Sequence, residues 1–570
     1  MRRTISLIFI QFLMLYSIGQ DGITFHPPVK IPIYLSGNFG EIRSDHFHSG
    51  IDIKTQGTIG HHVFSIDDGY ISRIKVQTNG YGKSIYITHP NGFTSVYGHL
   101  DRYRDDIAAY VNSMQYKQQS HMVDLYLKQE TFPLERGEFI AYSGNTGGSS
   151  GPHLHFEIRS SSNQHPTNVL NYNFDIKDRV APRFHSLHLY PMDNRSHLNG
   201  KSEKFSIRVV KDNGIYTIPY GTKIDGSGTL GISVEVFDYL DGASNRCGVH
   251  TLEMYVDNKL SYSHVMDEFS FSETRYINAH TDYEERIRSG IKAHRLHRLP
   301  NDRLRIYNKS VDNQALVVDE SRRYPIRIVA TDVAGNSSVL EFSIQGSNET
   351  VAVPDTDTGN VTTMKYNKAN SFEEGPVRVD IPANALYQNM DFTFSISPQA
   401  DGSLTPFYHI ASREVPVHSS YTLSIKSPSI DPTLYKKLLL ISHNDDNEVE
   451  SAGGEYRDGA VVAKLRNFGE YSVALDTIAP EIIPLNNSKR GDYSGRKQLR
   501  FTILDDLSGI ENYEGYIDNQ WALFEYDPKS NLLLYKFDLK RITKGSAHEL
   551  ELYVVDKKGN VNLLHTTFNW

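Results

Sequence analysis

Four short motifs occur twice in this sequence, and both copies keep the same order along the chain. The paired motifs are DRVAPRF (Asp178–Phe184) with DTIAPEI (Asp476–Ile482), VFDYLDG (Val236–Gly242) with ILDDLSG (Ile503–Gly509), YVDNKL (Tyr255–Leu260) with YIDNQW (Tyr516–Trp521), and ATDVAGN (Ala330–Asn336) with VVDKKGN (Val554–Asn560). Because the order is kept, we infer a duplicated domain whose first copy carries long insertions. Alternating strand residues and Asp-x-x-Gly-Asn turns favour an immunoglobulin-like β-sandwich over residues 181–347 and again over 477–570.

Between the two copies the chain has a polar linker and a further stretch with strand-like alternation. The linker reads VPDTDTGNVTT (Val353–Thr363), and residues 348–476 as a whole are predicted to form a β-domain of uncertain type. The β-domains either bind a partner or act as spacers that hold the N-terminal region at a distance.

The N-terminus has the pattern of a secretory signal peptide over residues 1–19. Arg2 and Arg3 precede an apolar run, and Ser17 and Gly19 supply the small residues of a cleavage site. We therefore expect export to the periplasm or envelope of a bacterium, with an uncleaved anchor as the alternative. No other run is apolar and long enough to predict a membrane span. The mature chain is expected to begin at or near Gln20, and N-terminal sequencing of exported protein that recovered Met1 would contradict this.

The amino-acid composition excludes several kinds of site and partner. Cys247 is the only cysteine of the 570 residues, which excludes an intramolecular disulfide and a cysteine-ligated metal site. A metal would therefore be held by histidine and carboxylate, and a lone thiol is expected to be a buried small apolar residue. The net charge is −9 and no dense basic patch is present, which argues against nucleic acid as a partner.

The N-terminal region, residues 20–180, contains short β-like runs separated by glycine turns, interrupted by a polar segment (residues 101–129) that is predicted to be helical. One run, SSGPHLHFEI, places His153, His155 and Glu157 on one face of a strand and apolar residues on the other. Glu157 either orients a histidine or is a solvated strand carboxylate. A His-x-His pair alone is a weak signal for metal.

A second motif, SDHFHSGIDI, supplies His48 and Asp52. Gly50 and the neighbouring β-branched residues indicate a loop entering a strand rather than a helix. Two imidazoles and one carboxylate would leave a tetrahedral zinc site with its fourth position open to water.

Three motifs in this order, HFHSGIDI, SVYGHL and GNTGGSSGPHLHFEI, resemble those of the lysostaphin-like (LytM-type) zinc metallopeptidases that cleave peptidoglycan peptides. The resemblance covers about residues 30–175. It implies a lysostaphin-type β-sheet peptidase domain with a duplicated hybrid motif and a helical insertion, in a mainly β chain whose remaining three domains are β-sandwich-type.

The same resemblance implies one Zn²⁺ in this domain, with His48, Asp52 and His155 as its ligands. It makes His153 the catalytic base and His99 the second catalytic histidine, which either stabilises the oxyanion or protonates the leaving amine. Peptidoglycan peptides are the implied substrate.

The sequence departs from this family in one respect, because the spacing between His99 and His153 is longer than expected. The excess falls in residues 101–129, which are expected to form a wall or lid over the substrate groove. Small residues are expected to leave space for a peptide at Gly144, Gly147, Gly148 and Gly151, and surface or turn positions are expected for His61, His62, His89 and His121. Two other functions stay open: a non-catalytic wall-binding regulator of other hydrolases, and a surface adhesin or scaffold.

Overall fold

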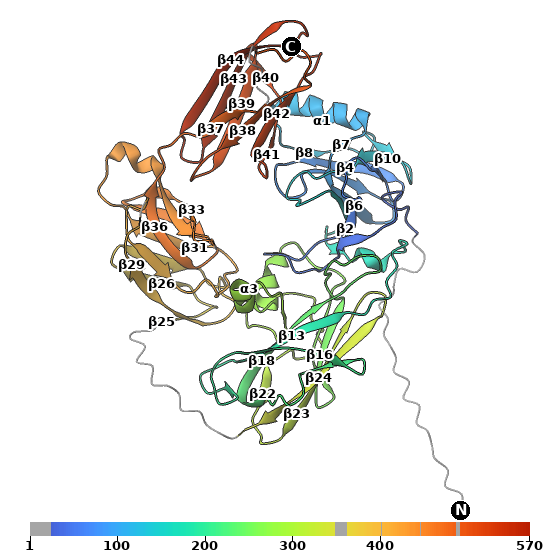
Figure 1. Ribbon diagram of the computed structural model, residues 1–570, viewed down its shortest axis with the longest axis vertical. Coiled ribbons are helices and arrows are strands. Elements are labelled where there is room, and N and C mark those ends of the chain that lie inside the picture. Colours follow the sequence, from blue (N-terminus) through green and yellow to red (C-terminus); the bar gives the residue numbers. More distant parts are fainter. Residues whose placement is uncertain (1–23, 348–361, 401, 445, 486–490) are drawn as a thin grey trace, which may run out of the picture.

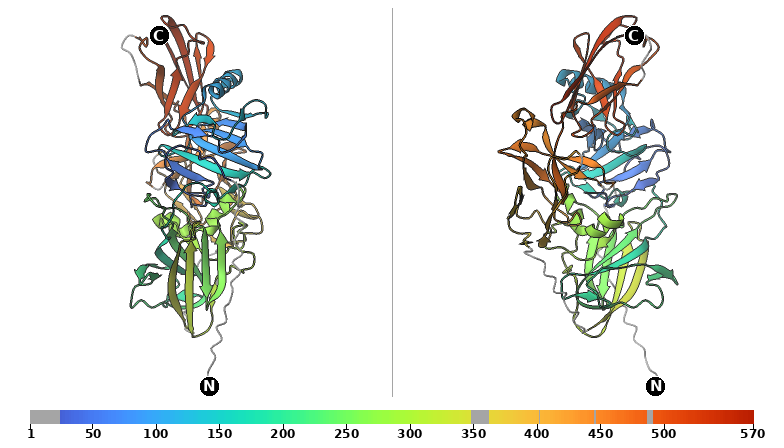
Figure 2. Two further views of the ribbon diagram at one scale, coloured as in Figure 1. Left: turned by 90° about the vertical axis from the view of Figure 1, so that its right-hand side faces the viewer. Right: turned by 60° about the vertical axis from the view of Figure 1, so that its left-hand side comes forward.

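A computed structural model describes residues 24–347, 362–400, 402–444, 446–485 and 491–570, so the predicted signal peptide lies outside the described residues. The chain is mainly β, as predicted, and its four folded units follow one another around a ring (Figure 1). The two side views of Figure 2 show the last unit beside helix α1 (Asp105–Gln118) of the first. Within the described ranges, no helix combines the length and apolar character that a membrane crossing requires.

The N-terminal domain is built on one antiparallel sheet with the strand order β1-β2-β11-β6-β5-β4-β8. The strands are β1 (Leu35–Gly37), β2 (Ile51–Lys54), β4 (Gly69–Val76), β5 (Lys83–Thr88), β6 (Phe93–Leu100), β8 (Val123–Tyr126) and β11 (His153–Ser160). Short strands β9 (Pro133–Leu134) and β12 (Pro166–Thr167) pair with β4 and β11, respectively. A smaller sheet contains β3 (His62–Phe64), β10 (Phe139–Tyr142) and β7 (Arg102–Tyr103).

Strand β11 shows the predicted alternation of an apolar and a polar face. Leu154, Phe156 and Ile158 are fully buried in the core of the domain. Burial of side chains of this size stabilises a fold by about 1.5–3 kcal/mol each. The apolar face therefore fixes the register of β11, and this register places the polar side chains of β11 on the other face of the sheet, beside Asp52 of β2.

The insertion at residues 101–129 is only partly helical. Helix α1 buries Ile107 and Val111, and the chain then forms strand β8, because Val123 and Leu125 alternate with exposed residues. Strand β8 lies at the opposite edge of the sheet from β1 and β2. The insertion therefore extends that far edge and is not a lid over β2 and β11.

Helix α1 instead contacts the C-terminal domain. The ring of Tyr116 makes an edge-to-face contact with Trp521, with ring centroids 5.3 Å apart, and the guanidinium of Arg541 lies 3.8 Å from the centre of the same ring. Nearby, the Lys83 ammonium is 3.2 Å from the carboxylate of Glu525. These contacts close the ring of domains.

Substituting Tyr116→Ala is expected to loosen this closure, since an aromatic pair contributes about 0.5–1.5 kcal/mol beyond the area it buries. Backbone amides of residues 519–527 should exchange faster with deuterium than in the wild type. Tyr220→Ala, at a fully exposed tyrosine, is the matched control. Unchanged exchange in the Tyr116 variant would show that the contact does not hold the domains together.

Two of the histidines expected at the surface are buried. His89 bonds to the Asp68 carbonyl oxygen at 2.8 Å and to Ser95 Oγ at 2.7 Å. His121 lies against the C-terminal domain, 3.2 Å from the Tyr513 hydroxyl, and burial lowers its pKa to about 4. His89 begins the predicted turn, since its carbonyl oxygen accepts from Gly92 at 3.3 Å, but its side chain points inward, and His121 is buried by a contact distant in sequence.

The first sandwich, after residue 180, has two groups of strands that enclose one core, β15-β13-β18 and β24-β23-β19-β20. Their bounds are β13 (Arg183–Pro191), β15 (Phe205–Arg208), β18 (Asp225–Phe237), β19 (Thr251–Val256), β20 (Lys259–Val265), β23 (Arg323–Thr331) and β24 (Ser337–Gly346). Smaller strands are β14 (His197–Leu198), β16 (Val210–Asp212), β17 (Ile215–Thr217), β21 (His294–Arg295) and β22 (Leu316–Val318).

An insertion in this sandwich carries helices α2 (Ile277–His280) and α3 (Tyr283–Ser289). Phe39, Ile42 and Phe47 of the N-terminal domain belong to the same apolar core as this sandwich. The two domains therefore share one hydrophobic core beside residue 48.

The middle domain pairs two sheets, β26-β27-β31-β35-β34 and β29-β30-β36-β32-β33. Their bounds are β26 (Asn370–Glu374), β27 (Val377–Ile381), β29 (Phe394–Ser397), β30 (Phe407–Ile410), β31 (Tyr421–Lys426), β32 (Leu438–His443), β33 (Val449–Gly453), β34 (Glu455–Arg457), β35 (Ala460–Leu465) and β36 (Gly469–Leu475). A separate pair is β25 (Thr362–Met364) with β28 (Met390–Phe392).

The second sandwich has the sheets β37-β38-β42-β41 and β40-β39-β43-β44. The strands are β37 (Glu481–Pro484), β38 (Gln498–Leu504), β39 (Ile510–Ile517), β40 (Gln520–Ala522), β41 (Phe524–Asp527), β42 (Leu532–Lys536), β43 (Ala547–Asp556) and β44 (Val561–Asn569). Both sheets contribute to one core.

Candidate metal centre

His48, Asp52 and His155 come together at the β2–β11 edge of the N-terminal sheet. His155 lies directly opposite Asp52 in the antiparallel register of these strands, so their side chains share a face. His48 lies in the turn before β2. This turn approaches β11 closely at Gly50, where a Cβ atom would lie 2.3 Å from the Phe156 carbonyl oxygen.

The facing atoms of these three residues form a nearly equilateral triangle. Asp52 Oδ1 is 3.0 Å from His48 Nε2 and 3.0 Å from His155 Nδ1, and the two nitrogens are 3.1 Å apart. Ligands of a tetrahedral ion with bonds of ~2.0–2.1 Å are separated by about 3.3 Å. The triangle therefore has nearly the size that a bound zinc ion requires.

The outer nitrogens of both imidazoles are committed to other partners. His48 Nδ1 donates to the Asn38 carbonyl oxygen at 2.8 Å, and His155 Nε2 donates to Glu157 Oε1 at 2.7 Å. In the neutral rings, the inner nitrogens then carry lone pairs that face each other and a carboxylate. Three acceptors this close repel one another without a cation between them, so the donor set fits a metal.

Asp52 is ionised in this setting. Burial would raise its pKa, but without a metal the charge of His48 and hydrogen bonds from His153, His155 and His48 hold the pKa well below its ordinary value. Its second oxygen, Oδ2, accepts a hydrogen bond from Arg43 at 2.8 Å, which leaves Oδ1 facing the histidines.

Glu157 is buried and directs His155, which settles the choice between its two predicted roles. Besides His155, its carboxylate accepts hydrogen bonds from Tyr81 at 2.5 Å, Ser49 at 2.6 Å and Arg159 at 2.5 Å. Burial alone would raise its pKa, but Arg159 and His155 lower it instead. A carboxylate that holds the outer nitrogen of a histidine fixes the tautomer and ring orientation needed for metal binding.

Replacing Glu157 with glutamine is expected to weaken zinc binding by about 10–100-fold, because an amide can accept from fewer of these donors and offers no charge to His155. Competition with a zinc indicator would measure the affinity. Glu130→Gln, at an exposed turn, serves as the control. Equal zinc affinity in the two variants would show that Glu157 does not support zinc binding.

His153 and His99 lie beside the triangle without completing it. His153 Nε2 is 3.4 Å from Asp52 Oδ1, and the rings of His153 and His99 have centroids 4.7 Å apart. Their Nδ1 atoms donate to the carbonyl oxygens of Gly151 at 2.8 Å and Thr146 at 2.7 Å. Both rings therefore present an Nε2 lone pair.

The backbone and electrostatics of His99 are unusual. It has a φ of +58°, a left-handed conformation that side chains rarely adopt and that clusters at functional sites. Burial, followed by the neighbouring histidines His155 and His153, lowers its pKa to about 3, so His99 is neutral.

The glycine-rich loop before β11 is packed more closely than predicted. A Cβ at Gly144 would lie 2.3 Å from the Asp101 nitrogen, and one at Gly147 would lie 2.3 Å from the Gly82 nitrogen. Of the four glycines, only Gly151 faces open space, and a Cβ at Gly148 would make an ordinary contact of 3.5 Å with Gly80. Gly144 and Gly147 therefore serve close backbone contacts, and the expected room for a peptide is limited to the end of the loop.

Two distant domains contact this centre. Asn38, whose carbonyl oxygen holds His48, exchanges two side-chain hydrogen bonds with the backbone of Gly248 in the first sandwich, at 2.7 and 2.8 Å. Lys529 of the second sandwich donates to the carbonyl oxygens of Asn145 and Ser149 in the glycine-rich loop. Sequence reasoning missed both contacts, since no local pattern marks them.

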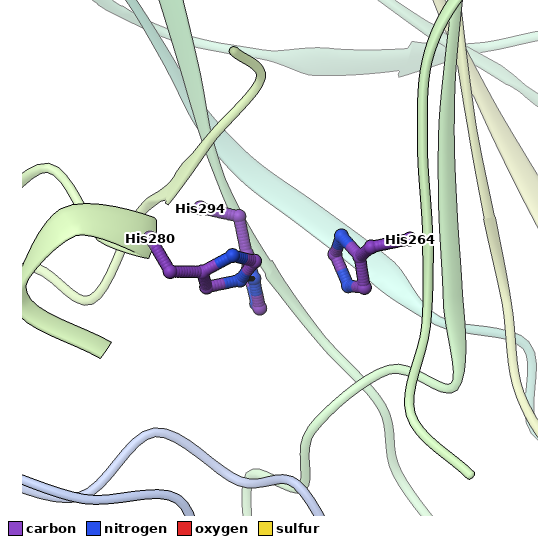
Figure 3. A group of neighbouring side chains, drawn as sticks. All are labelled: His264, His280 and His294. Carbon is purple, nitrogen blue, oxygen red and sulfur yellow. Dashed lines mark hydrogen bonds between the residues drawn. The ribbon is translucent and has the colours of Figure 1, made fainter. Parts of the chain in front are cut away.

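A second histidine group lies in the core of the first sandwich (Figure 3). His280 and His294 are hydrogen-bonded to each other at 2.9 Å, and His264 bonds to the Tyr262 hydroxyl at 2.9 Å. Burial lowers the pKa of all three. His280 also packs on Phe47, with ring centroids 5.5 Å apart, so this neutral cluster supports the loop that carries His48.

Two family models match the chain. One, described as Peptidase family M23, matches residues 46–116 and 110–169, and the other, described as a Zu5-like domain, matches residues 361–476. An uncharacterized metalloprotease of Haemophilus influenzae is 32% identical over 135 residues, which cover 24% of this chain and 21% of the relative. The DD-carboxypeptidase/endopeptidase Mpg of Neisseria meningitidis is 33% identical over 113 residues, 20% of each chain. The chain thus spans about a fifth of the length of these curated relatives.

Solved structures similar to part of this chain include the catalytic domain of lysostaphin from Staphylococcus simulans, with 25% identity, a TM-score of 0.16, and coverage of 22% of this chain and 78% of that one. A zinc-containing peptidase from Vibrio cholerae has 25% identity and a TM-score of 0.18, covering 25% of this chain and 37% of that one.

Proposed function

Because the Peptidase family M23 model matches residues 46–116 and 110–169, we propose that this chain is an exported zinc metalloendopeptidase that hydrolyses peptide bonds in bacterial peptidoglycan. The triangle of His48, Asp52 and His155 is the observation that carries this proposal. The similarity to a relative named DD-carboxypeptidase/endopeptidase supports wall peptides as substrate. The signal-peptide pattern of residues 1–19 supports export to the periplasm or envelope.

One zinc ion would be held by His48 Nε2, Asp52 Oδ1 and His155 Nδ1. When bound, zinc supplies Lewis acidity at a scissile carbonyl and lowers the pKa of water. Asn38 and Glu157 keep both imidazoles in the tautomer that offers a lone pair to the ion.

His153 is the proton acceptor in this proposal. Its Nδ1 hydrogen is held by the Gly151 carbonyl oxygen, so Nε2 is free to take the proton of an attacking water beside Asp52. Its side chain retains 15% exposure, in contrast to 4% for His155, which leaves it accessible to a substrate.

The proton that His153 takes from the attacking water passes to the leaving amine through His99, whose ring centroid lies 4.7 Å from that of His153. In the resting site the Nδ1 hydrogen of His99 is engaged by Thr146 and Nε2 carries none, so it holds no hydrogen for an oxyanion. Once protonated, an imidazole whose pKa is about 3 releases its proton readily to an amine.

The β-domains are proposed to position this site and to contact the envelope. The contacts of Gly248 with Asn38 and of Lys529 with the glycine-rich loop support a positioning role. An envelope protein bound through these domains would then place the site on its substrate.

A synthetic cross-linked wall tetrapeptide dimer tests the substrate class. Mass spectrometry is expected to find two peptide products whose masses sum to that of the substrate plus one water. A protein that carries zinc at this centre and leaves the dimer intact, together with isolated stem peptides, would contradict the proposed activity and favour a non-catalytic regulator.

A further inference from the structure

The repeated motifs bring three aspartates together in each sandwich. In the first sandwich, Asp178, Asp238 and Asp332 offer carboxylate oxygens that all lie within 4.8 Å of one another. In the second sandwich the same holds for a cluster of Asp476, Asp505 and Asp556. These residues occupy matching positions in the first, second and fourth repeated motifs.

Both clusters have the same hydrogen-bonded frame. The backbone nitrogen and Nδ2 of Asn336 each donate to a carboxylate oxygen of Asp332 at 2.8 Å, and Nδ2 also reaches the Asp178 carbonyl oxygen at 3.3 Å. In the second sandwich Asn560 makes the equivalent contacts to Asp556 and Asp476. The repeat thus builds the cluster, which is therefore not a chance grouping of surface acids.

The first cluster has uncompensated negative charge. Asp238 is 1% exposed, and its Oδ1 has no hydrogen-bond partner. Among the described residues, no lysine or arginine forms an ion pair with Asp178, Asp238 or Asp332. Burial, followed by the neighbouring carboxylates of Asp178 and Asp332, raises the pKa of Asp238 to about 8. Burying an ionised carboxylate without a partner costs free energy, and a bound cation would offset that cost.

The second cluster is partly compensated by the chain itself. Lys558 interacts electrostatically with Asp476 and Asp556, which oppose the lowering of its pKa by burial. Backbone nitrogens of Ser508 and Gly509 donate to the carboxylates of Asp476 and Asp505 at 3.2 and 2.7 Å. The need for an external cation is correspondingly smaller there.

We propose that Asp178, Asp238 and Asp332 bind one calcium ion at the junction of the N-terminal domain and the first sandwich. Carboxylate oxygens are the ligands that calcium prefers, and softer metals favour imidazole or thiolate. Calcium accepts six to eight oxygen ligands in flexible geometry, whereas magnesium demands near-ideal octahedral geometry and usually keeps several waters, which suits a mostly buried group of carboxylates less well.

The ion ties the connection between the domains to two loops of the sandwich. Asp178 lies in the segment that leads into β13, and Asp238 pairs through both backbone groups with Cys247 at 2.9 Å. The carbonyl oxygen of the next residue, Gly248, accepts a hydrogen bond from the Asn38 side chain. The carbonyl oxygen of Asn38 in turn accepts one from His48 Nδ1. Calcium therefore stiffens the loop on which one side of the metal centre rests.

Calcium binding is tested on the full chain with its zinc retained, in calcium-depleted buffer, by isothermal titration with CaCl₂ and by thermal unfolding. We expect one saturable site and a rise of several degrees in the unfolding temperature, with a smaller rise for the same concentration of MgCl₂. Absence of both signals, or an equal rise with magnesium, would overturn the assignment.

Asp238→Asn locates the site. Since this change removes a buried unpaired charge, the calcium-free variant should unfold at the wild-type temperature or above it, yet lose at least tenfold in calcium affinity. Asp505→Asn, the matching position of the second sandwich, should keep the wild-type response. If the Asp238 variant responds to calcium as the wild type does, the ion does not bind at this cluster.

Discussion

Replacing His153 with alanine is expected to lower hydrolysis by about 10²–10⁴-fold while leaving the zinc content close to one ion per chain. His153 Nε2 lies 3.4 Å from Asp52 Oδ1 and outside the triangle of His48, Asp52 and His155, so its loss removes a proton acceptor and no ligand. His99→Ala should behave in the same way.

Turnover of a wall peptide and metal content by atomic spectroscopy, measured on the same sample, decide this prediction. His62→Ala, at an exposed position on β3, is the control for loss of an imidazole. A His153 variant that loses its zinc while a His155 variant keeps it would reverse the two assignments.

Replacing His155 with alanine is expected to abolish both zinc binding and activity. Two protein ligands hold zinc poorly, and the change also leaves the buried Glu157 without one of its donors. His48→Ala and Asp52→Ala should give the same result, because each supplies one corner of the triangle.

The neighbouring His153→Ala is the matched control for this second prediction, since both residues lie on β11 and share a face. Circular dichroism would show whether each variant keeps its β structure. A folded His155 variant with full zinc and full turnover would contradict the proposed ligand set.

Local sequence patterns were sufficient for much of the N-terminal domain. Period-two alternation predicted strand β11 and its polar face, and the residues around Gly50 predicted a loop entering a strand at Asp52. These predictions succeed because side-chain alternation depends on neighbouring residues alone. The mainly β class was predicted for the same reason.

Contacts between distant residues were beyond such reasoning. Nothing near Asn38 indicates that Gly248, in another domain, holds its side chain. The segment at 101–129 was expected to cover the groove, but strand pairing and the Tyr116–Trp521 contact direct it toward the C-terminal domain. The repeated motifs predicted paired domains, yet the grouping of their aspartates depends on how three separate loops meet.

Release of peptides from purified sacculi tests the central proposal most directly. The full chain is incubated with sacculi alone, with a zinc chelator, and with the chelator followed by added zinc, and soluble peptides are quantified by mass spectrometry. The account predicts release by the untreated protein, loss of release with chelator, recovery with zinc, and no release by the His155→Ala variant. Equal release in the presence of chelator, or by that variant, would contradict it.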